Sequence, residues 1–274
     1  MPELPEVETV RRTLGQLVVG KTIESIEVGW GRIIKKPDDI NEFTTMLVGQ
    51  TFRAIGRRGK FLIFHLDDVV LVSHLRMEGR YGVYKKTDER STHTHIIFEF
   101  TDGTELRYQD VRKFGTMHVF AKGTEELELP LSKLGLEPFS EDFTVEQLKS
   151  GMKKTNRKIK VALLDQNTVV GLGNIYVDEA LFRAGIHPER SANSLQEGEY
   201  VKLHKHIINT LQQAVDLGGS SIKSYVNGQG EMGMFQQNLD VYGRKEEPCR
   251  KCGTLITKTV VGGRGTHFCL KCQK

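Results

Sequence analysis

The sequence predicts an α+β protein with an N-terminal sheet region, a helical region and a small metal-binding segment near the end. Three observations lead to this prediction. Short apolar runs separated by glycine and charged turns occupy residues 23–120, helical periodicity replaces them after residue 138, and all four cysteines lie between residues 249 and 272. With 274 residues, 38% of them hydrophobic and 27% charged, the chain is long enough for two cores and has the composition of an ordinary globular protein.

The first element is a helix expected over residues 5–19, where apolar residues recur at helical spacing. Pro5 suits the first turn, because its missing N–H would have no partner there, and Gly20 ends the helix. Pro2 and Glu3 precede this helix and cap nothing obvious. Because residue 2 is small, the initiator Met can be removed, which leaves Pro2 with a free secondary amine.

The second element is a set of short strands over residues 23–120. Runs such as KFLIFHL, VVLVSHL and HIIFEF are separated by turn residues, a spacing that indicates an antiparallel sandwich or barrel. The segment LPLSKLGLEP follows as the interdomain connection. We expect three domains: a sheet domain over 1–133, a helical domain over 134–237 and a metal-binding domain over 238–274.

The third element is a group of helices. Asn174 is expected to cap one that ends at Gly185, and the capping-box pattern from Ser194 to Glu197 begins a long one that Gly218 closes. The expected helices cover 145–152, 159–164, 174–184 and the stretch from 194 to 217. A Gly-rich stretch over 218–237 follows, and loops of that length are usually functional lids or disordered.

The cysteines form two CxxC pairs, Cys249/Cys252 and Cys269/Cys272. Each pair can direct two thiolates at one ion, and four thiolates make a closed tetrahedral site, so we expect one structural Zn²⁺. The alternative, two redox pairs, is disfavoured by this spacing. Clustered rather than dispersed cysteines favour a reducing, cytoplasmic setting over a secreted disulfide framework.

The charge pattern favours a polyanionic partner, and the lack of a long apolar run argues against a membrane partner. Net charge is only +4, but the segments 149–160 and 249–274 contain Lys and Arg and no acidic residue. Basic charge on a small zinc hairpin, here Lys258 and Arg264, most often meets nucleic acid, although a solvated surface is the alternative. The N-terminus lacks the pattern of a signal peptide, and no apolar run reaches the length of a membrane span.

Several motifs together resemble the formamidopyrimidine-DNA glycosylase family from the first residues to the last. They are MPELPEVETVRR, RRGKFL, SHLRMEG, DVRKFGT, GLGNIYVDEALFRAGIHP, VYGRKxxPCxxCG and GRGTHFCxxCQ. The resemblance implies a two-layered antiparallel β-sandwich with flanking helices, followed by a helical domain with a helix–two-turn–helix element and a zinc finger. It implies an enzyme that removes oxidised purines such as 8-oxoguanine from double-stranded DNA and then cuts the strand, acting as a monomer with damaged DNA as its partner.

The resemblance also assigns catalytic roles. Pro2 would attack C1′ of the damaged nucleotide, because an α-amino group is more often unprotonated near neutrality than a lysine and a secondary amine gives an iminium on attack. Glu3 would be the general acid that protonates the ring oxygen of the sugar. Lys60 would assist β-elimination, and Arg264 would bind phosphate and assist δ-elimination. Taken alone, Lys60 could equally be a strand-edge residue and Arg264 a solvated turn charge.

Other residues match positions that contact DNA in this family. Met77, Arg112 and Phe114 match the trio that fills the gap left by the extruded nucleotide, with Arg112 facing the widowed cytosine. Taken singly, Met77 and Phe114 would more often belong to a core. The residues matched to DNA contacts are His74, His93, Arg112, Lys160, Asn174, Tyr242 and Lys258. His74 could instead be structural, and His93 with His95 lacks a third ligand for a metal site.

The Gly-rich stretch corresponds to the loop that closes over the extruded purine. Ser220, Ser221 and Tyr225 offer donors there, and Glu78 is expected at the pocket floor. Two other functions stay open. A sister enzyme that prefers oxidised pyrimidines typically begins PEGPE, whereas Leu4 stands here, and a zinc-ribbon DNA-binding protein without catalysis would not require Pro2 and Glu3.

Overall fold

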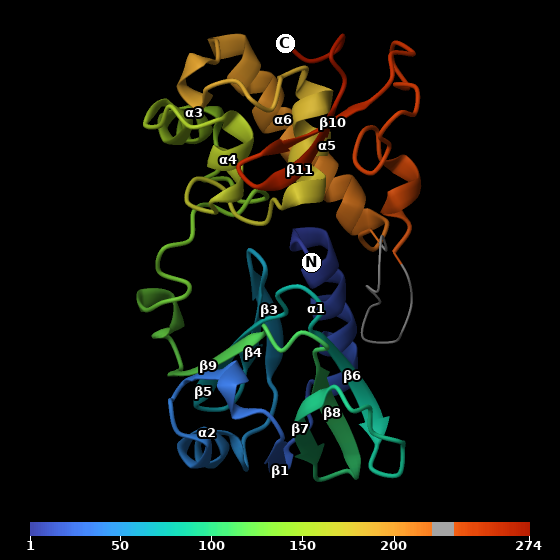
Figure 1. Cartoon of the computed structure of the whole chain (residues 1–274). Coiled ribbons are helices and arrows are strands. Elements are labelled where there is room, and N and C mark those ends of the chain that lie inside the picture. Colours follow the sequence, from blue (N-terminus) through green and yellow to red (C-terminus); the bar gives the residue numbers. More distant parts are fainter. Residues whose placement is uncertain (221–232) are drawn as a thin grey trace. The chain divides into compact units, whose positions relative to one another are not determined.

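The computed structural model describes residues 1–220 and 233–274 (Figure 1). The chain forms two compact units. The N-terminal unit comprises Met1–Ser132 with Gly218–Met234, and the C-terminal unit comprises Lys133–Leu217 with Phe235–Lys274. The division into three domains made from the sequence stays a prediction.

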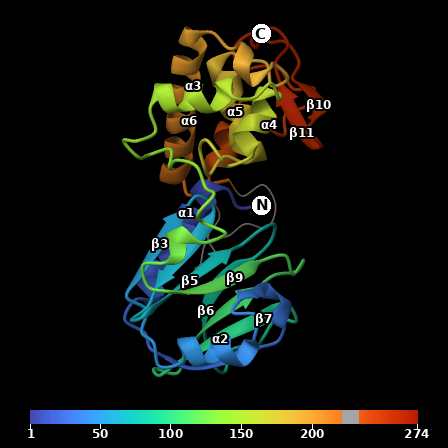
Figure 2. The same ribbon diagram turned by 90° about the vertical axis from the view of Figure 1, so that its left-hand side faces the viewer.

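Two sheets form most of the N-terminal unit, and both are visible in the side view of Figure 2. One has the strand order β2-β9-β5-β4-β3 and the other the order β1-β7-β8-β6. The strands are β1 (Ile23–Val28), β2 (Ile34–Lys36), β3 (Ala54–Arg58), β4 (Phe61–His65), β5 (Val69–His74), β6 (Arg80–Lys85), β7 (Thr94–Phe100), β8 (Thr104–Gln109) and β9 (Thr116–Ala121). Neighbouring strands are antiparallel, apart from the short parallel pair of β2 and β9.

The two sheets share one hydrophobic core. The ring of Phe52 lies edge-on to Phe64 of the first sheet at 5.6 Å and to Phe98 of the second at 6.5 Å between ring centroids. Helix α1 (Leu4–Val18) buries Val10 and Leu14 in the same core. The predicted sandwich is therefore confirmed. Helix α2 (Ile40–Leu47) and two 3₁₀ turns, Gly31–Ile33 and Glu125–Leu127, complete this unit.

Helices dominate the C-terminal unit. They are α3 (Val145–Lys153), α4 (Ile159–Leu164), α5 (Asn174–Ala184) and α6 (Glu197–Asp216), with 3₁₀ turns at Ala192–Ser194 and Phe235–Asn238. The last element is an antiparallel hairpin of β10 (Thr257–Val261) and β11 (Arg264–Phe268). Within the described ranges, no helix combines the length and the hydropathy of a membrane span.

Three predicted helix starts were wrong. Glu3 does cap α1: Glu3 and Glu6 form a capping box in which each side chain accepts from the other's backbone. Gly173, not Asn174, is the N-cap of α5. The capping box of α6 is made by Gln196 and Glu199 rather than by Ser194 and Glu197, since Ser194 lies in the preceding 3₁₀ turn.

Candidate functional site

The N-terminal end of α1 carries the first two candidate residues. Pro2 and Glu3 are buried, with Glu3 only 2% exposed, whereas Met1 is exposed. The backbone N–H of Glu3 donates to Oε2 of Glu6 at 2.8 Å, which fixes the chain direction at the helix start. Pro2 therefore lies directly before the N-terminus of α1, beside the carboxyl groups of Glu3 and Glu6.

Lys60 and His74 lie at the end of the first sheet. Lys60 follows the positive-φ residue Gly59 in the turn between β3 and β4 and is 7% exposed. His74 ends β5, directly opposite Phe61 in register, and their rings meet edge-on at 4.5 Å. The turn between the strands and the end of β5 therefore bring the Lys60 and His74 side chains to one end of the sheet.

His74 is held in one protonation state. Burial, and then the positive charges of Arg76 and Lys60, lower the pKa of His74 to about 3. Its Nδ1 accepts the backbone N–H of Arg76 at 2.8 Å, so in the neutral ring the proton is on Nε2. His74 is thus a neutral hydrogen-bond donor near neutral pH, suited to an oxygen acceptor such as a phosphate.

The three candidate gap-filling residues lie in two loops of the N-terminal unit. Met77, between β5 and β6, is half-buried, while Arg112 and Phe114, between β8 and β9, are exposed. Phe114 is 52% exposed, and the guanidinium of Arg112 lies 4.8 Å from the centre of its ring. An exposed aromatic ring stacked with a cation is unusual for a core residue and fits a surface that inserts into DNA.

Two histidines considered for a metal pair have other partners. His95 is 5% exposed, and its Nε2 lies 2.8 Å from the carbonyl oxygen of Asp110. His93 is half-buried, and its carbonyl accepts the backbone N–H of Asp110. Among the residues that the structure describes, the one group arranged to hold a metal consists of the four cysteines.

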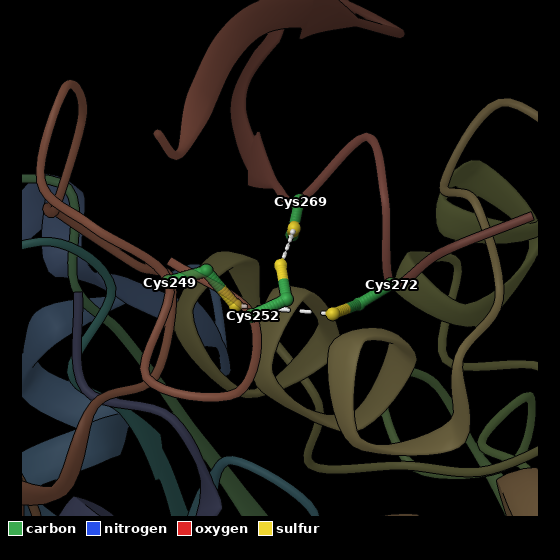
Figure 3. Close-up of side chains that lie close together, drawn as sticks. All are labelled: Cys249, Cys252, Cys269 and Cys272. Atoms are coloured by element: carbon green, nitrogen blue, oxygen red, sulfur yellow. Dashed lines mark hydrogen bonds between the residues drawn. The ribbon is translucent and has the colours of Figure 1, made fainter. Parts of the chain in front are cut away.

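The zinc site has the geometry that four thiolates require. The Sγ atoms of Cys249 and Cys272 are 3.9 Å apart, and those of Cys252 and Cys269 are 3.5 Å apart (Figure 3). A tetrahedron with Zn–S bonds of about 2.3 Å has edges of about 3.8 Å, so these residues fit the ion. Four protein ligands leave no open position, which makes this a structural zinc site of the finger.

The zinc hairpin is anchored to the helices of the C-terminal unit through one carbonyl. The carbonyl oxygen of Gly265 accepts from Nζ of Lys160 at 3.2 Å and from Nδ2 of Asn174 at 2.9 Å. Arg264, the residue before Gly265, is exposed. The carbonyl contact therefore sets where Arg264 lies relative to the start of α5.

Lys160 differs from the other residues matched to DNA contacts, because its side chain is fully buried. Its Nζ lies 2.7 Å from Oδ1 of Asp178, which is also fully buried. This burial argues against a direct contact between Lys160 and DNA. The DNA contact expected for Lys160 stays a prediction, and in the structure its side chain holds the hairpin through Gly265.

The remaining matched residues lie on or beside the hairpin. Lys258 is exposed on β10, opposite His267 in register, and a Cβ on Gly265 would lie 3.4 Å from its Cε. Tyr242 is half-buried, with its ring edge-on to His267 at 5.0 Å. Lys258 and Arg264 thus offer two exposed cationic side chains on one small element.

The lesion-pocket residues are only partly described. Ser220 is 4% exposed and pairs with Met234 in an isolated bridge, and Glu78 is half-buried in the Met77 loop. Ser221 and Tyr225 lie outside the described residues. Sequence reasoning missed three buried polar residues that hold the site loops, namely Glu6, Tyr108 and Asp110, because their partners are distant in sequence or are backbone groups.

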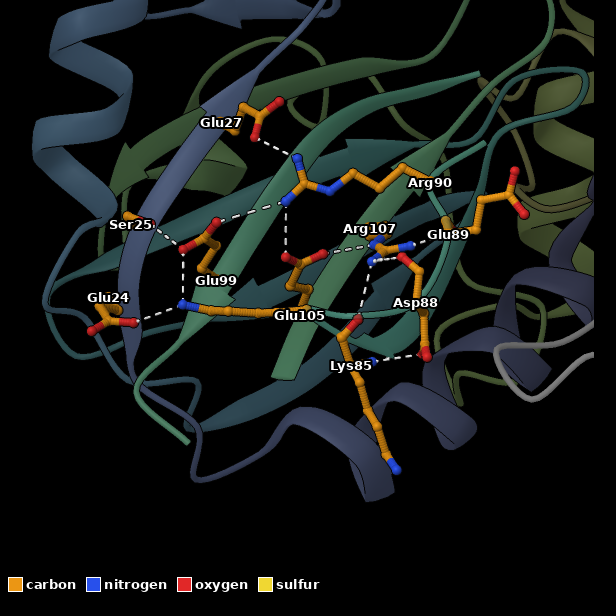
Figure 4. A network of polar contacts seen from close by, with 11 residues as sticks. Glu24, Ser25, Glu27, Lys85, Asp88, Glu89, Arg90, Glu99, Glu105 and Arg107 are labelled. Carbon is orange, nitrogen blue, oxygen red and sulfur yellow. Dashed lines mark hydrogen bonds and ion pairs between the residues drawn. The ribbon is translucent and has the colours of Figure 1, made fainter. Parts of the chain in front are cut away.

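A second concentration of charge lies on the four-stranded sheet and is structural. Arg107 and Glu105 form a fully buried pair at 2.7 Å, and Arg107 also donates to the carbonyls of the loop after β6 (Figure 4). Arg90 joins Glu105 to Glu27 at the surface. The side chains of these four residues are thus paired with one another or with carbonyls, so they stabilise the loop.

Family models match most of the chain. The formamidopyrimidine-DNA glycosylase N-terminal domain matches residues 1–117, the H2TH domain of the same enzymes matches 134–226, and a zinc finger found in FPG and IleRS matches 246–274. The chain belongs to the formamidopyrimidine-DNA glycosylase family. It is a DNA glycosylase of base-excision repair that acts on oxidised purines, with the AP lyase activity of its family.

Individual relatives are similar to this chain over their full length. The formamidopyrimidine-DNA glycosylase of Cytobacillus firmus is 71% identical over 273 residues, covering 100% of both chains, and that of Bacillus subtilis is 63% identical over 100% of this chain and 99% of the relative. A solved complex of Lactococcus lactis Fpg with DNA containing N7-benzyl-Fapy-dG has 45% identity, full coverage of both chains and a TM-score of 0.93. Another complex of that enzyme, with DNA containing an abasic site, has a TM-score of 0.94 and covers 99% of each chain.

Proposed function

We propose that the amine of Pro2, freed by removal of Met1, is the nucleophile of this glycosylase. Its nitrogen attacks C1′ of the damaged nucleotide while the C1′–N bond to the base breaks with its electron pair, and the departing base takes up the proton that the nitrogen loses. Opening of the sugar ring gives an iminium between Pro2 and C1′, which withdraws electrons during the two eliminations that release the phosphates. The position of Pro2 supports this role, since it lies next to the buried carboxyl group of Glu3 at the start of α1.

Glu3 is the proposed general acid. It adjoins Pro2, and its backbone is fixed by the capping box with Glu6. Transfer of its proton to the ring oxygen of the sugar assists ring opening, and the resulting carboxylate faces the iminium as a counter-charge. The observation that carries the proposal is this pair of adjacent buried residues, Pro2 and Glu3, at the N-terminus of α1.

The other matched residues have binding roles in this proposal. Met77, Arg112 and Phe114 fill the gap in the base stack, and Arg112 hydrogen-bonds the widowed cytosine. Arg264, Lys258, Tyr242, Asn174, Lys60, His74 and His93 supply phosphate contacts, with Lys60 and Arg264 also assisting β- and δ-elimination. Glu78 and Ser220 border the base, together with Ser221 and Tyr225. Lys160 has no direct contact and positions the Arg264 hairpin.

Borohydride trapping tests the catalytic proposal. Wild-type protein should become covalently joined to DNA containing an abasic site, because reduction converts the iminium to a stable amine. Pro2→Gly should trap at least tenfold less while it retains affinity for the same DNA. Intact mass must show Met1 absent from the active protein. Equal trapping by Pro2→Gly, or full activity with Met1 retained, would assign the nucleophile to another residue.

We also propose that the protein is a cytoplasmic monomer. The four closely spaced thiols support a reducing compartment, and full-length relatives come from bacteria. Sedimentation at micromolar concentration should give a single species with the mass of one chain. A dimer under those conditions would contradict the proposal.

A second substrate class has one specific observation in its favour. Lactococcus lactis Fpg, 44% identical with a TM-score of 0.93, has been solved with DNA containing an oxidised pyrimidine. We infer that this chain also excises an oxidised pyrimidine, more slowly than 8-oxoguanine. Competition between duplexes with 8-oxoguanine and with thymine glycol measures the preference, and faster cutting of thymine glycol would reverse it.

A further inference from the structure

The loop that carries Arg112 and Phe114 is built around one buried carboxylate. Asp110 is 1% exposed, and it accepts the backbone N–H groups of Arg112 at 3.0 Å, Phe114 at 2.9 Å and Gly115 at 2.8 Å. Three charge-assisted hydrogen bonds from backbone N–H groups of one loop restrict the conformation of that loop. The carboxylate therefore sets the direction in which the two exposed side chains leave the loop.

The backbone of this loop adopts a conformation that needs such support. Lys113, between Arg112 and Phe114, has a φ of 59°, a left-handed value that is unfavourable for a residue with a side chain. Its Nζ lies 4.3 Å from the centre of the Trp30 ring. Trp30 is the single tryptophan of the chain, so its fluorescence reports where Lys113 lies.

Tyr108 connects this loop to the one that carries Met77. Its hydroxyl donates to Oδ2 of Asp110 at 3.2 Å. A Cβ on Gly115 would be 1.7 Å from the hydroxyl oxygen of Tyr108, and a Cβ on Gly79, two residues after Met77, would be 2.4 Å from it. The hydroxyl therefore fills the space between the two loops, and only glycine at both positions admits it.

The protonation of Tyr108 suits a donor. Burial, followed by the negative charge of Asp110, raises the pKa of its hydroxyl well above the ordinary value. Asp110 is itself fixed to the sheet, because its N–H donates to the carbonyl of His93 and its carbonyl lies 2.8 Å from Nε2 of His95. Both loops are thus attached, through Asp110 and Tyr108, to the end of β8.

We propose that Asp110 and Tyr108 are positioning residues that hold Met77, Arg112 and Phe114 in the arrangement required to fill the DNA gap and to read the opposite base. This inference rests on the gap-filling role proposed above. Asp110 and Tyr108 do not touch the DNA in this account. They act through the backbone of the two loops, so their loss should weaken the choice of opposite base more than it weakens strand cutting in general.

The variants Asp110→Asn and Tyr108→Phe test the inference. Asparagine offers one acceptor oxygen instead of two and places an NH₂ group against a backbone N–H, while phenylalanine keeps the ring and removes only the hydroxyl. We expect the ratio of excision rates for 8-oxoguanine opposite cytosine and opposite adenine to fall at least fivefold in Asp110→Asn and at least twofold in Tyr108→Phe. Unequal loss on the two duplexes is the signature of positioning, because general destabilisation lowers both rates equally.

Trp30 fluorescence provides a second readout without DNA. The emission of Asp110→Asn should move toward that of Lys113→Met, which removes the nearer of two cations at the ring and leaves Arg32, at 5.5 Å, in place. Asp67→Asn is the matched control, because Asp67 also accepts a backbone N–H, that of Thr51 at 2.8 Å, but lies between β4 and β5 outside the site. It should match wild type in both the rate ratio and the emission.

Arg112→Ala separates failure of this inference from failure of the proposed function. Suppose that Arg112→Ala lowers the ratio of excision rates opposite cytosine and opposite adenine, while Asp110→Asn and Tyr108→Phe change neither this ratio nor the Trp30 emission. The positioning inference is then wrong and the gap-filling role stands. If Arg112→Ala also leaves the ratio unchanged, the gap-filling role is wrong and the inference is lost with it.

Discussion

The carboxylate of Glu6 accepts the backbone N–H of Ser220 at 2.7 Å, joining the first turn of α1 to a residue more than two hundred positions later. Its other oxygen accepts the N–H of Glu3. Gly219 has a φ of +82°, and a Cβ there would lie 2.7 Å from Oε1 of Glu6. One carboxylate thus fixes both the backbone next to Pro2 and the start of the Gly-rich stretch.

Replacing Glu6 with Gln should impair both ends of this link. Glutamine has one acceptor oxygen, so one of the two buried N–H groups loses its partner, at a cost of about 1–3 kcal/mol in the free energy of unfolding. We expect single-turnover excision of 8-oxoguanine to fall at least tenfold. Denaturant unfolding and rapid-quench kinetics measure the two effects.

Asp39→Asn is the matched control for Glu6→Gln. Asp39 caps α2 and accepts the N–H of Glu42 at 2.8 Å in an exposed position. Its replacement should leave excision at the wild-type rate. A Glu6→Gln protein that is as active as Asp39→Asn would show that the link has no part in catalysis.

The runs named from the sequence match strands that alternate or are uniformly apolar, but they did not include β2, β3 or β6. The segment of β3, AIGRR, contains two arginines, which an edge strand tolerates but which obscure the strand pattern. The segment of β6 contains Gly82, which also weakens the pattern. Both form because neighbouring strands supply hydrogen bonds in register. Such tertiary pairing is not encoded in the local pattern.

In the candidate site, too, some residues could be predicted from the local sequence and others depend on tertiary contacts. The zinc ligands follow from the spacing of four cysteines, because the chemistry needs only their sequence separation. The roles of Asp110 and Glu6 depend on which backbone N–H groups the fold brings to a carboxylate. The burial of Lys160 likewise depends on Asp178 from another helix, and no local pattern distinguishes it from an exposed lysine.

Lys160→Met should strongly destabilise the C-terminal unit. It leaves the carboxylate of Asp178 buried without its cation, and breaking a buried pair in this way costs about 3–5 kcal/mol. Calorimetry should show a lower melting temperature, with the zinc content unchanged. The double variant Lys160→Met/Asp178→Asn should recover part of the loss, since no charge is stranded. If it were no more stable than Lys160→Met, the pair would not be the cause.

Removing zinc should weaken DNA binding through the hairpin. The core around the cysteines is small, with Phe182, Val241 and Ile256 as its other buried members, so the hairpin depends on the metal. Without it, Lys258 and Arg264 should lose the phosphate contacts proposed for them. Affinity should fall at least tenfold, and the slope of log affinity against log salt should drop by about 2, or roughly 0.9 for each contact.

Re-addition of Zn²⁺ provides the control for chelation. It should restore both the affinity and the salt slope, whereas Mg²⁺ should restore neither, because magnesium prefers oxygen ligands. In Cys252→Ser the chelator should have little further effect. Undiminished binding by the zinc-free protein would show that the hairpin makes no DNA contact.

Acidification should destabilise the N-terminal unit through His74. The pKa of His74 is lowered from 6.5 to about 3 in the folded protein, chiefly by burial. Above pH 6.5 His74 is neutral in both the folded and the unfolded state. Below pH 6.5 it binds a proton in the unfolded chain but not in the folded protein. Stability should therefore fall as the pH drops from 6.5 to 3, by about 2 kcal/mol at most from this residue at pH 5.

Urea unfolding followed by Trp30 emission measures this loss, because Trp30 lies in the N-terminal unit. His74→Gln cannot titrate, so its stability should depend less steeply on pH between 6.5 and 5 than that of wild type. His118, whose pKa burial and the charges of Lys35 and Lys36 lower to about 4, adds a loss of similar size between pH 6.5 and 5, so the pH dependence of His74→Gln should be shallower than that of wild type and not abolished. If His74→Gln and wild type lost stability in parallel, the protonation of His74 would not be linked to folding, and its assignment as a neutral Nε2 donor would fail with it.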